Sequence, residues 1–502
     1  MDFLNNLGIG FVQVLQPINL LYCFIGVFVG TLIGVLPGIG PVGTMSMLFP
    51  LIIVSTPFQG IILLAGIYYG AMYGGSTTSI LVNIPGEAAS VITCLDGYQM
   101  AKQGRAGPAL GISAIGSFIG GTFSVLLLSL LAVPLAKVAL DLGPVEYVGL
   151  MTMGLAMTIY LSGKSLLKGG IMTFLGLSLG CIGTDLVTGK VRLTFGLHEL
   201  YDGLNIASMA MGLFGISEVL ANLSLKERVV FKTKVGSLFP TLEDWKKCAF
   251  PIVRSSFLGF FLGIIPGGGG VISSFVTYAV EKKISKYPEK FGQGVIEGVA
   301  APETANNAAV GGAFIPLFVL GIPSNVIMAV LMSAFIVYGV APGPRFISSN
   351  IELFWGIIAS MYVGNIMLLL INLPLIGIWI KLLKIPYSIL FPLIILFCCI
   401  GVYSIDYRIF DVLLMIIFGI IGFFLNKYDY PLAPLVFSFV LGPLLEDSFR
   451  QSLIIGSSDL LYFIKNPITS VSFGISLFLF LSAFFRQSRK KVMESSGFIE
   501  KN

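Results

Sequence analysis

Residues 257–325 read FLGFFLGIIPGGGGVISSFVTYAVEKKISKYPEKFGQGVIEGVAAPETANNAAVGGAFIPLFVLGIPSN, and they depart twice from the pattern of an ordinary membrane helix. The first departure is Pro266 with Gly267–Gly270, where proline removes a backbone donor and the glycines lower helix propensity. The second is Gly321–Ser324. A polar cluster precedes it: Glu303, Thr304, Asn306 and Asn307. Because freed backbone at membrane depth must be buried in protein or line a watery cavity, we expect these groups to coordinate a transported species.

An earlier stretch repeats these features in a weaker form. Three features recur in order: Gly30-xxx-Gly34-xx-Pro37-Gly38 as Gly259-xxx-Gly263-xx-Pro266-Gly267, Gly74 with Ile84-Pro85 as Gly312 with Ile322-Pro323, and Gly107-Pro108 as Gly343-Pro344. All three recur at a spacing of about 235 residues, which indicates an internal duplication. A pair of Gly/Pro-interrupted segments in corresponding halves points to the binding site of a secondary transporter.

The composition places the chain in the membrane. Of its 502 residues 56% are hydrophobic and only 11% are charged, and no soluble globular domain has this balance. Long apolar runs recur along the chain, as helices that cross a bilayer require. The net charge of +5 is modest and concentrated in loops, so it informs topology and does not indicate a nucleic-acid partner. The six cysteines show no metal-binding spacing and are expected to pack as small apolar residues.

The sequence predicts an all-α polytopic membrane protein with about eleven or twelve transmembrane helices, two re-entrant hairpins and two inverted repeats. The predicted parts are a first repeat at 1–245 (broken element 34–41, motif 73–111), a second repeat at 246–485 (broken element 259–270, motif 297–324) and a basic cytoplasmic tail at 486–502. Further spans are expected near 108–133, 145–161, 165–183, 205–223, 326–341, 353–380, 387–405, 409–425 and 467–485. The charged segment 432–464 is expected to be broken or amphipathic.

The basic loops set the expected topology. Residues 226–247 and 281–290 are both rich in lysine, so the positive-inside rule places both loops in the cytoplasm. The apolar stretch between them is broken at its centre by the glycines, and it therefore enters and leaves on one side. In the first half the loop 55–59 carries no charge, whereas Lys102 and Arg105 follow the next span. The first hairpin thus opens outward and the second inward, which makes the repeats inverted.

Three long motifs resemble the large membrane subunit of the tripartite tricarboxylate transporters, the TctA family. They are GVLPGIGP (34–41), YGGSTTSILVNIPGEAASVITCLDGYQMAKQGRAGPALG (73–111), and GIIPGGGG (263–270) with EGVAAPETANNAAVGGAFIPLFVLGIPS (297–324). The resemblance covers nearly the whole chain. It departs at Ser324, where the family usually continues with glycine, and at the longer glycine run, which leaves the substrate open.

This resemblance implies secondary uptake of carboxylates across the bacterial cytoplasmic (inner) membrane by a multi-pass permease. It implies three partners: a small membrane subunit of the same transporter, a periplasmic solute-binding protein, and the carboxylate substrate. Transport is expected to be driven by a Na⁺ or H⁺ gradient, with no cofactor. The absence of a GxxxxGK[ST] phosphate loop agrees with a transporter that does not use ATP.

The polar cluster is expected to bind the coupling cation. Glu303, Asn306 and Asn307 stand at i, i+3 and i+4, so a helix puts them on one face. A carboxylate at membrane depth is expensive and by default functional, and it would repel an anionic substrate. We therefore assign these three residues, with the unwound backbone at Gly321 and Pro323, to Na⁺ or H⁺. The alternative is a carboxylate that caps a helix or accepts from a backbone amide. No dedicated metal site is predicted.

The anionic substrate is expected at the two glycine-rich breaks, where helix N-termini offer free amides. The predicted substrate-binding residues are Pro37, Gly38, Gly40, Ser76, Thr77, Thr78, Asn83, Pro266, Gly267, Gly268 and Gly269. Membrane Ser and Thr also commonly bond their own helix, so each hydroxyl has a structural alternative. Glu87 and Asp96 lie in the second motif without an assigned role, and His198 is expected to be a solvated loop residue.

Two other functions stay open on the residues alone. A cation/proton antiporter built on inverted repeats would transport without any partner. An intramembrane enzyme is the third possibility, but the sequence contains neither HExxH nor GxSxG, and a single histidine leaves little acid/base equipment. We therefore expect a carboxylate permease and no enzymatic activity. The carried carboxylate and the oligomeric state are not indicated by the residues.

Overall fold

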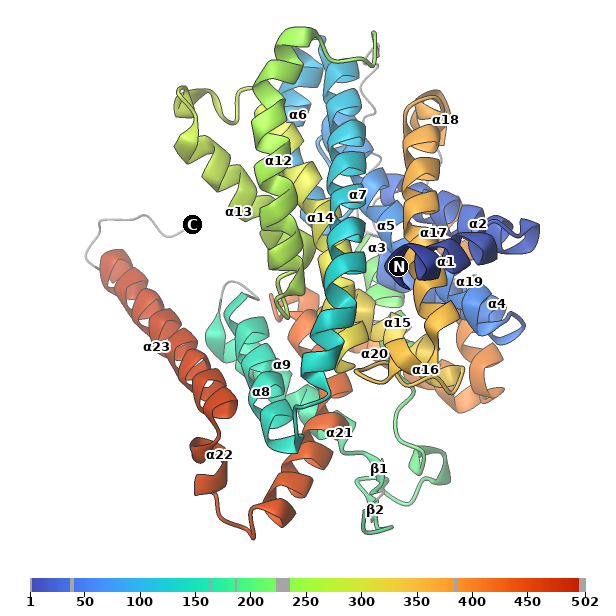
Figure 1. Ribbon diagram of the computed structural model, residues 1–502, viewed down its shortest axis with the longest axis vertical. Helices are drawn as coiled ribbons and strands as arrows, with labels where there is room; N and C mark the ends of the chain where they lie inside the picture. The colour runs from blue at the N-terminus through green and yellow to red at the C-terminus, as the bar shows by residue number, and fades with distance from the viewer. Residues whose placement is uncertain are drawn as a thin grey trace. The chain divides into compact units, whose positions relative to one another are not determined.

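The computed structural model describes residues 2–36, 40–161, 165–185, 187–222, 235–382 and 387–495. Within these residues the chain is almost entirely helical, with one short two-stranded sheet (Figure 1). It forms two compact units, Met1–Lys137 with Ile206–Phe423 and Val138–Asn205 with Phe424–Asn502. The second unit interrupts the first in sequence, so these units are not the two predicted repeats, which stay a prediction.

The first unit contains the site. Its elements are α1 (Asp2–Val14), α2 (Pro17–Val35), α3 (Gly40–Met47), α4 (Phe49–Ile53), α5 (Pro57–Val82), η1 (Ala88–Val91), α6 (Thr93–Lys102), most of α7 (Ala106–Ala139), α10 (Ile206–Ala210), the π-helical η3 (Met211–Ile216), α11 (Ser217–Asn222), α12 (Leu242–Ile264), α13 (Gly269–Ile284), η4 (Pro288–Lys290), α14 (Glu297–Leu320), α15 (Val326–Val337), α16 (Phe346–Ser349), α17 (Ile351–Asn372), α18 (Ile376–Leu382), α19 (Tyr387–Asp406) and most of α20 (Ile409–Lys427).

The second unit is a smaller helical bundle. Its elements are α8 (Pro144–Leu161), α9 (Leu166–Gly180), β1 (Gly183–Thr184), β2 (Val191–Arg192), η2 (His198–Leu200), α21 (Leu432–Ile455), α22 (Leu461–Lys465) and α23 (Pro467–Ser495). The segment 432–464 is interrupted between α21 and α22, but α21 continues unbroken through the charges at 446, 447 and 450 from which a break was expected. Those charges pair: Arg450 bonds Asp185 at 2.9 Å and Glu446 at 2.5 Å, and Arg192 bonds Glu446 at 2.7 Å.

Seven of the described helices are long and apolar enough to cross a membrane: α2, α7, α8, α12, α17, α20 and α21. Shorter apolar helices accompany them, at Phe3–Val14, Leu166–Gly180, Ile206–Ala221, Val326–Val337, Phe391–Asp406 and Pro467–Ser482. The predicted class, an all-α polytopic membrane protein, is confirmed. The expected basic tail begins inside α23, and residues 496–502 lie outside the described part.

Two central helices, α5 and α14, are buried along almost their whole length. Every residue of α5 from Gly60 to Leu81 is buried, and so is every residue of α14 from Gly298 to Val319. Neither belongs to the seven apolar spans, because both are rich in Gly, Ser, Thr or Asn. Helices that are surrounded by protein carry small and polar residues, which allow close packing and hydrogen bonding between helices. The predicted polar motifs therefore lie on the most enclosed helices of the unit.

Helix α2 lies beside α5 and runs in the same direction. A Cβ on Gly26, Gly30 or Gly34 would stand only 2.4–2.6 Å from the backbone oxygen of Leu63, Ile67 or Ala71 respectively. Both series rise together along the chain, so the two helices are parallel. Only glycine permits this approach of two backbones.

Helix α12 lies on α14 in the same way. A Cβ on Gly259 would meet the oxygen of Ala305 at 2.4 Å, and one on Gly263 would meet that of Ala309 at 2.3 Å. These two helices are therefore also parallel. In contrast, Ser274 of α13 bonds Pro302 while Gly270 faces Asn306, so α13 runs antiparallel to α14. Helices α12 and α13 thus form a hairpin about the glycine break, and the re-entrant position of this hairpin in the bilayer stays a prediction.

Both central helices end at a left-handed residue followed by Ile-Pro. Helix α5 ends at Asn83, with φ 57°, and α14 ends at Gly321, with φ 69°. The following isoleucine amides fold back, from Ile84 to the Thr78 oxygen at 3.5 Å and from Ile322 to the Pro316 oxygen at 3.2 Å. Such endings satisfy terminal carbonyls, and the proline prevents the helix from continuing. The predicted Ile84-Pro85 and Ile322-Pro323 breaks are therefore real helix ends, the first at the exposed Asn83 and the second in the interior of the unit.

Candidate functional site

The site is centred on one face of α14. Glu303, Asn306 and Asn307 all lie in regular helix and are 1%, 1% and 3% exposed. They share a face, as their spacing predicted. Helices α6, α7 and α13 and the segment around η1 supply the neighbouring polar groups.

Glu303 is held at one carboxylate oxygen only. Its Oε1 accepts a hydrogen bond from the Thr93 hydroxyl of α6. Its backbone oxygen accepts from the Ser117 hydroxyl at 3.4 Å and from the Asn307 amide at 3.1 Å. The other carboxylate oxygen, Oε2, is buried and has no hydrogen-bond partner among the described residues. The nearby Ser113 hydroxyl of α7 does not meet hydrogen-bond geometry with it, so Glu303 keeps an acceptor available in the interior.

Asn306 donates its Nδ2 group to Oε1 of Glu87 at 3.2 Å. Its Oδ1 is buried and has no partner within the described structure. A Cβ at position 270 would stand 2.1 Å from this oxygen. Only a glycine at position 270 therefore leaves room for the Asn306 side chain. This contact joins α14 to the beginning of α13.

Asn307 is arranged in the same manner. Its Nδ2 donates to the Ser117 hydroxyl of α7 at 2.8 Å, whereas its Oδ1 has no partner among the described residues. The hydroxyl oxygen of Thr304 is likewise buried without a partner in this part of the chain. A buried polar oxygen that makes no hydrogen bond costs about 1–3 kcal/mol. Three of these four oxygens, on Glu303, Asn306 and Asn307, can only accept, and oxygens of this kind suit a hard cation.

No cationic side chain balances the site. None of the ion pairs between described residues includes Glu303 or Glu87. The described chain also contains no group of three or more His, Cys, Asp or Glu residues that could hold a metal ion. Two buried carboxylates without a positive partner are unfavourable unless a cation or proton compensates them.

The second break lies directly against the end of α14. The Gly267 amide donates to the Ser324 oxygen at 2.7 Å, and Gly267 and Gly269 have φ of +77° and +52°. Pro323 precedes the acceptor and Gly321 ends the helix. The structure thus brings the predicted substrate glycines 267–269 next to the predicted cation residues. The preceding Pro266 is half-buried at the start of this turn.

The first break is only partly described. Pro37 and Gly38, two predicted substrate residues, lie outside the described residues. Gly40 begins α3 with φ +66°. On the α5 side, Gly86 packs so closely that a Cβ would stand 2.0 Å from the Gly34 oxygen. The turn after α5 therefore contacts the end of α2, next to the first break.

The predicted hydroxyls of α5 bond their own helix. Ser76 donates to the Tyr73 oxygen at 2.8 Å and Thr78 donates to the Gly75 oxygen at 3.1 Å. Thr77 is buried, and Asn83 forms the left-handed end of α5. Ser76 and Thr78 accordingly take the structural alternative in this structure, and contact of all four residues with a substrate stays a prediction.

Sequence reasoning did not assign four residues that complete the neighbourhood: Glu87, Thr93, Asp96 and Ser117. Asp96 is fully buried and accepts from Tyr278 at 2.8 Å and from the Gly292, Gly294 and Val295 amides at 2.7–3.0 Å. It fixes the connection before α14. Glu87 could have been found from the sequence repeat, because it stands two residues after Ile84-Pro85 just as Asn325 stands two residues after Ile322-Pro323.

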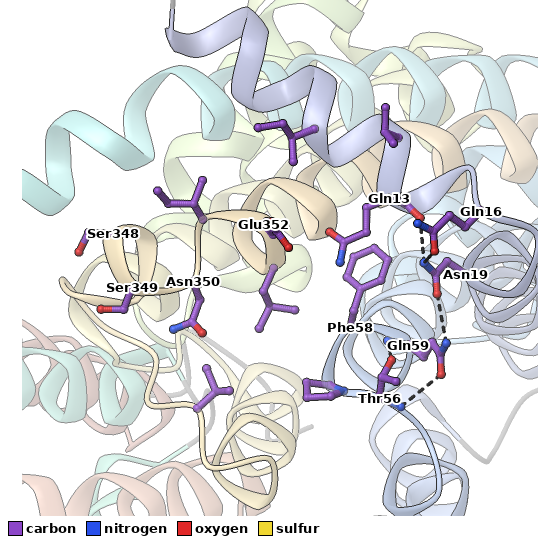
Figure 2. Close-up of a pocket in the computed structure, with 16 residues that line it drawn as sticks. Gln13, Gln16, Asn19, Thr56, Phe58, Gln59, Ser348, Ser349, Asn350 and Glu352 are labelled. Atoms are coloured by element: carbon purple, nitrogen blue, oxygen red, sulfur yellow. Dashed lines mark hydrogen bonds between the residues drawn. The ribbon is translucent and has the colours of Figure 1, made fainter.

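A separate polar cavity of about 880 Å³ lies where α1 ends and where α2, α5 and α17 begin. Figure 2 shows side-chain amides around it, and Gln59 bonds Asn19 at 3.2 Å while Asn19 bonds the Gln13 backbone oxygen at 2.8 Å. Glu352 is the one charged side chain among the lining residues. The lining contains none of the predicted site residues.

Comparison with known proteins agrees with the motifs. The model of the tripartite tricarboxylate transporter TctA family matches residues 20–437. An uncharacterized 52.8 kDa protein from the TAR-I ttuC′ 3′ region of Agrobacterium vitis is 49% identical over 492 residues, 98% of each chain. An uncharacterized protein from the TAR-II ttuC′ 3′ region of the same organism is 50% identical over 233 residues, 46% of this chain and 96% of that protein. No solved structure matches. The chain belongs to the TctA family of tripartite tricarboxylate transporters.

Proposed function

We propose that this chain is the permease of a secondary transporter that imports tricarboxylates or related carboxylates across a bacterial inner membrane. A cation gradient drives it, a periplasmic solute-binding protein delivers the substrate, and a small membrane subunit completes the transporter. The observation that carries the proposal is the set of four buried, unpartnered oxygens on α14, one of them from the Glu303 carboxylate, beside the carboxylate of Glu87. A membrane-embedded site of this kind binds a cation, and family membership supplies the class of cargo.

The oxygens favour Na⁺ over a proton as the coupling ion. A proton needs one acceptor, and the free Oε2 of Glu303 alone would satisfy it. The free amide oxygens of Asn306 and Asn307 are instead typical ligands of a metal cation, which is held by several neutral and charged oxygens at once. Both asparagines have their NH₂ groups bonded elsewhere, so their oxygens are the groups left for a ligand.

The substrate would bind on the other side of the glycine break. The turn Gly267–Gly269 leads into α13, and the first amides of that helix have no partner within it. The positive end of the helix dipole favours a carboxylate there. Because Asn306 contacts Gly270, the cation and the carboxylate would lie on adjacent parts of one site. Their opposite charges would then favour binding together, which is the basis of symport.

Inverted repeats would give this site its two access directions. The glycine contacts support the duplication: a Cβ on Gly74 would stand 3.0 Å from the Gly34 Cα, and one on Gly312 would stand 3.3 Å from the Gly263 Cα. These are the residues that the sequence pairs as repeats. The central helices also approach each other antiparallel, since the end of α5 reaches the middle of α14 and the end of α14 reaches the middle of α5.

The polar cavity would be the outer entrance. The uncharged loop 55–59 is predicted on the outer side, and it borders this cavity. Its lining mixes apolar side chains with amides and hydroxyls, and these polar groups can receive a hydrophilic acid from the binding protein. Glu352 is an unfavourable neighbour for an anion, so the cavity would serve for passage and not for tight binding.

The experiment is uptake of radiolabelled citrate and succinate by proteoliposomes that contain this chain and the small subunit. Imposed Na⁺ or proton gradients are compared, with and without the binding protein. We expect uptake that requires the binding protein and a Na⁺ gradient and that falls at least a hundredfold in Glu303→Gln. Partner-free Na⁺/H⁺ exchange without carboxylate uptake would contradict the proposal and identify a cation/proton antiporter.

A further inference from the structure

Glu87 lies immediately after the first Ile-Pro break and is almost completely buried. One carboxylate oxygen, Oε2, accepts from the Ala89 amide at 2.6 Å and caps η1. The other, Oε1, accepts from the Nδ2 group of Asn306 at 3.2 Å. A cap alone would use one oxygen and would not require a second bond to α14. The side chain therefore links the break after α5 to the face of α14 that carries Glu303.

The same link exists in the other half without the charge. With the spacing that relates Gly74 to Gly312, Glu87 corresponds to Asn325 and Asn306 corresponds to Tyr68. Asn325 donates its Nδ2 group to the Tyr68 hydroxyl at 3.1 Å and caps α15 through Met328. The side chain that follows each Ile-Pro break thus forms a hydrogen bond with a side chain in the middle of the opposite central helix. Only one of the two equivalent positions holds a carboxylate, so the charged site is confined to the Glu87 side.

Glu87 also determines how the Asn306 amide is oriented. Because Nδ2 points to the Glu87 carboxylate, Oδ1 points away from it and stays unpartnered beside Gly270. A carboxylate accepts only, so it cannot hold the amide in the reverse orientation. Ser117 and the Glu303 backbone oxygen do the same for Asn307 by taking its Nδ2 group. The amide oxygens are thereby fixed as acceptors before any ion binds.

The negative charges of Glu87 and Glu303 also favour the binding of a cation. Glu87 bonds Asn306 on the helix face that carries Glu303, so the two carboxylates border one site and repel each other when both are ionised. Neither forms an ion pair with a described Lys or Arg. A monovalent cation between them would relieve this repulsion, and its binding would weaken if either charge were removed.

We propose that Glu87 is a positioning residue of the Na⁺ site, which orients the Asn306 oxygen toward the ion and supplies the second negative charge. This inference rests on the proposed function, because it concerns the cation site on α14. It extends that site to the segment that follows Ile84-Pro85, so that residues of both halves of the chain hold one ion.

The test is equilibrium binding of ²²Na⁺ to the purified full chain in detergent, which needs no partner or transport. The variants are Glu303→Gln, Glu87→Gln and Glu87→Ala. Glu289→Gln is the control, because it removes an exposed carboxylate from the loop before α14. We expect Glu303→Gln to abolish binding, Glu87→Gln to weaken it tenfold or more as outer ligand-orienting groups do, and Glu289→Gln to match the wild type.

The glutamine variant separates orientation from folding. The side-chain amide in Glu87→Gln keeps an oxygen for the Ala89 amide, so thermal unfolding of this variant should resemble the wild type, whereas Glu87→Ala should unfold earlier. Wild-type affinity in Glu87→Gln, with binding lost in Glu303→Gln, would overturn the role of Glu87 and leave the cation site intact. A wild-type chain that binds no ²²Na⁺, or that binds it equally in Glu303→Gln, would overturn both.

Discussion

The Gly267 amide donates to the Ser324 backbone oxygen at 2.7 Å, so the glycine break before α13 and the proline break after α14 are joined directly. Two irregular segments of a membrane protein satisfy each other in this way, where water cannot. The bond holds only while Gly267 keeps its positive φ of +77°. Movement of the α12–α13 hairpin would therefore displace the end of α14 and the proposed cation-binding residues.

Substitution of Gly267 by alanine should impair transport. An L-residue in left-handed backbone costs about 1–2 kcal/mol, and relief of this strain would turn the amide away from Ser324. We expect Gly267→Ala to lose most carboxylate uptake in proteoliposomes. Gly104→Ala is the control, because Gly104 has a similar φ of +79° with open space around it and lies outside the site. Equal uptake by the two variants would show that the break need not keep this geometry.

The packing of α12 on α14 should be sensitive to a single methyl group. A Cβ on Gly312 would stand 2.1 Å from the Phe260 backbone oxygen, so Gly312→Ala must separate the two helices. Overpacking of this kind costs about 1–3 kcal/mol, and thermal unfolding in detergent should occur at a lower temperature. Gly8→Ala in α1 meets nothing within 4 Å, and it should leave the unfolding temperature unchanged or raise it. An unchanged melting temperature in Gly312→Ala would disprove the close approach.

The local features of the site could be predicted from the sequence, because they depend on residues near one another in the chain. Proline and glycine mark the ends at 266–270 and 321–324, and the spacing of Glu303, Asn306 and Asn307 places them on one helix face. A search for long apolar helices, however, misses α5 and α14. Protein surrounds these helices on all sides, so they need small residues for contact and not an apolar surface for lipid.

The contacts between the halves could not be predicted, because they depend on how distant segments pack. Nothing in the local pattern shows that Glu87 meets Asn306 or that Asp96 meets the Gly292 amide, nearly two hundred or more residues away. Hydroxyls such as that of Ser76 were ambiguous for another reason. A serine in a helix can donate to its own preceding turn or to a ligand, and the side-chain rotamer decides between them.

The loop that holds β1 and β2 should loosen only in strong acid. The Thr188 hydroxyl and the Arg450 guanidinium lower the pKa of Asp185 well below its ordinary value of 3.8. Since the folded pKa is the lower one, the stabilisation is complete above the ordinary value and is lost as the pH falls toward the folded one. Cleavage by pepsin between residues 183 and 203 should therefore begin only well below the ordinary pKa of 3.8.

Removal of the arginine should shift this onset upward. In Arg450→Gln the Asp185 carboxylate loses its charged partner at 2.9 Å, so its pKa returns toward the ordinary value. Pepsin should then cut this loop at a higher pH than in the wild type. Lys465→Gln is the control, since it breaks only an exposed pair with Asp459 elsewhere in the same unit. An identical onset in Arg450→Gln would show that the pair does not hold the loop.

Asp96→Asn should release the connection that leads into α14. Both carboxylate oxygens of Asp96 accept hydrogen bonds, one from Tyr278 and Gly292 and the other from Gly292, Gly294 and Val295. An asparagine would turn an NH₂ group toward at least one of these donors. Because bonds to a charged acceptor contribute about 1.5–3 kcal/mol each, we expect faster amide hydrogen exchange at residues 292–295 and an earlier thermal transition.

Tyr278→Phe provides the graded comparison for this prediction. It removes the phenolic donor at 2.8 Å and leaves the three backbone amides on Asp96, so exchange at 292–295 should change far less than in Asp96→Asn. If Asp96 only fixes the start of α14, Na⁺ binding should weaken in proportion to the loss of order in this connection, because the carboxylate bonds the backbone before Glu303 and not Glu303 itself. Normal exchange together with abolished Na⁺ binding in Asp96→Asn would instead place Asp96 at the ion.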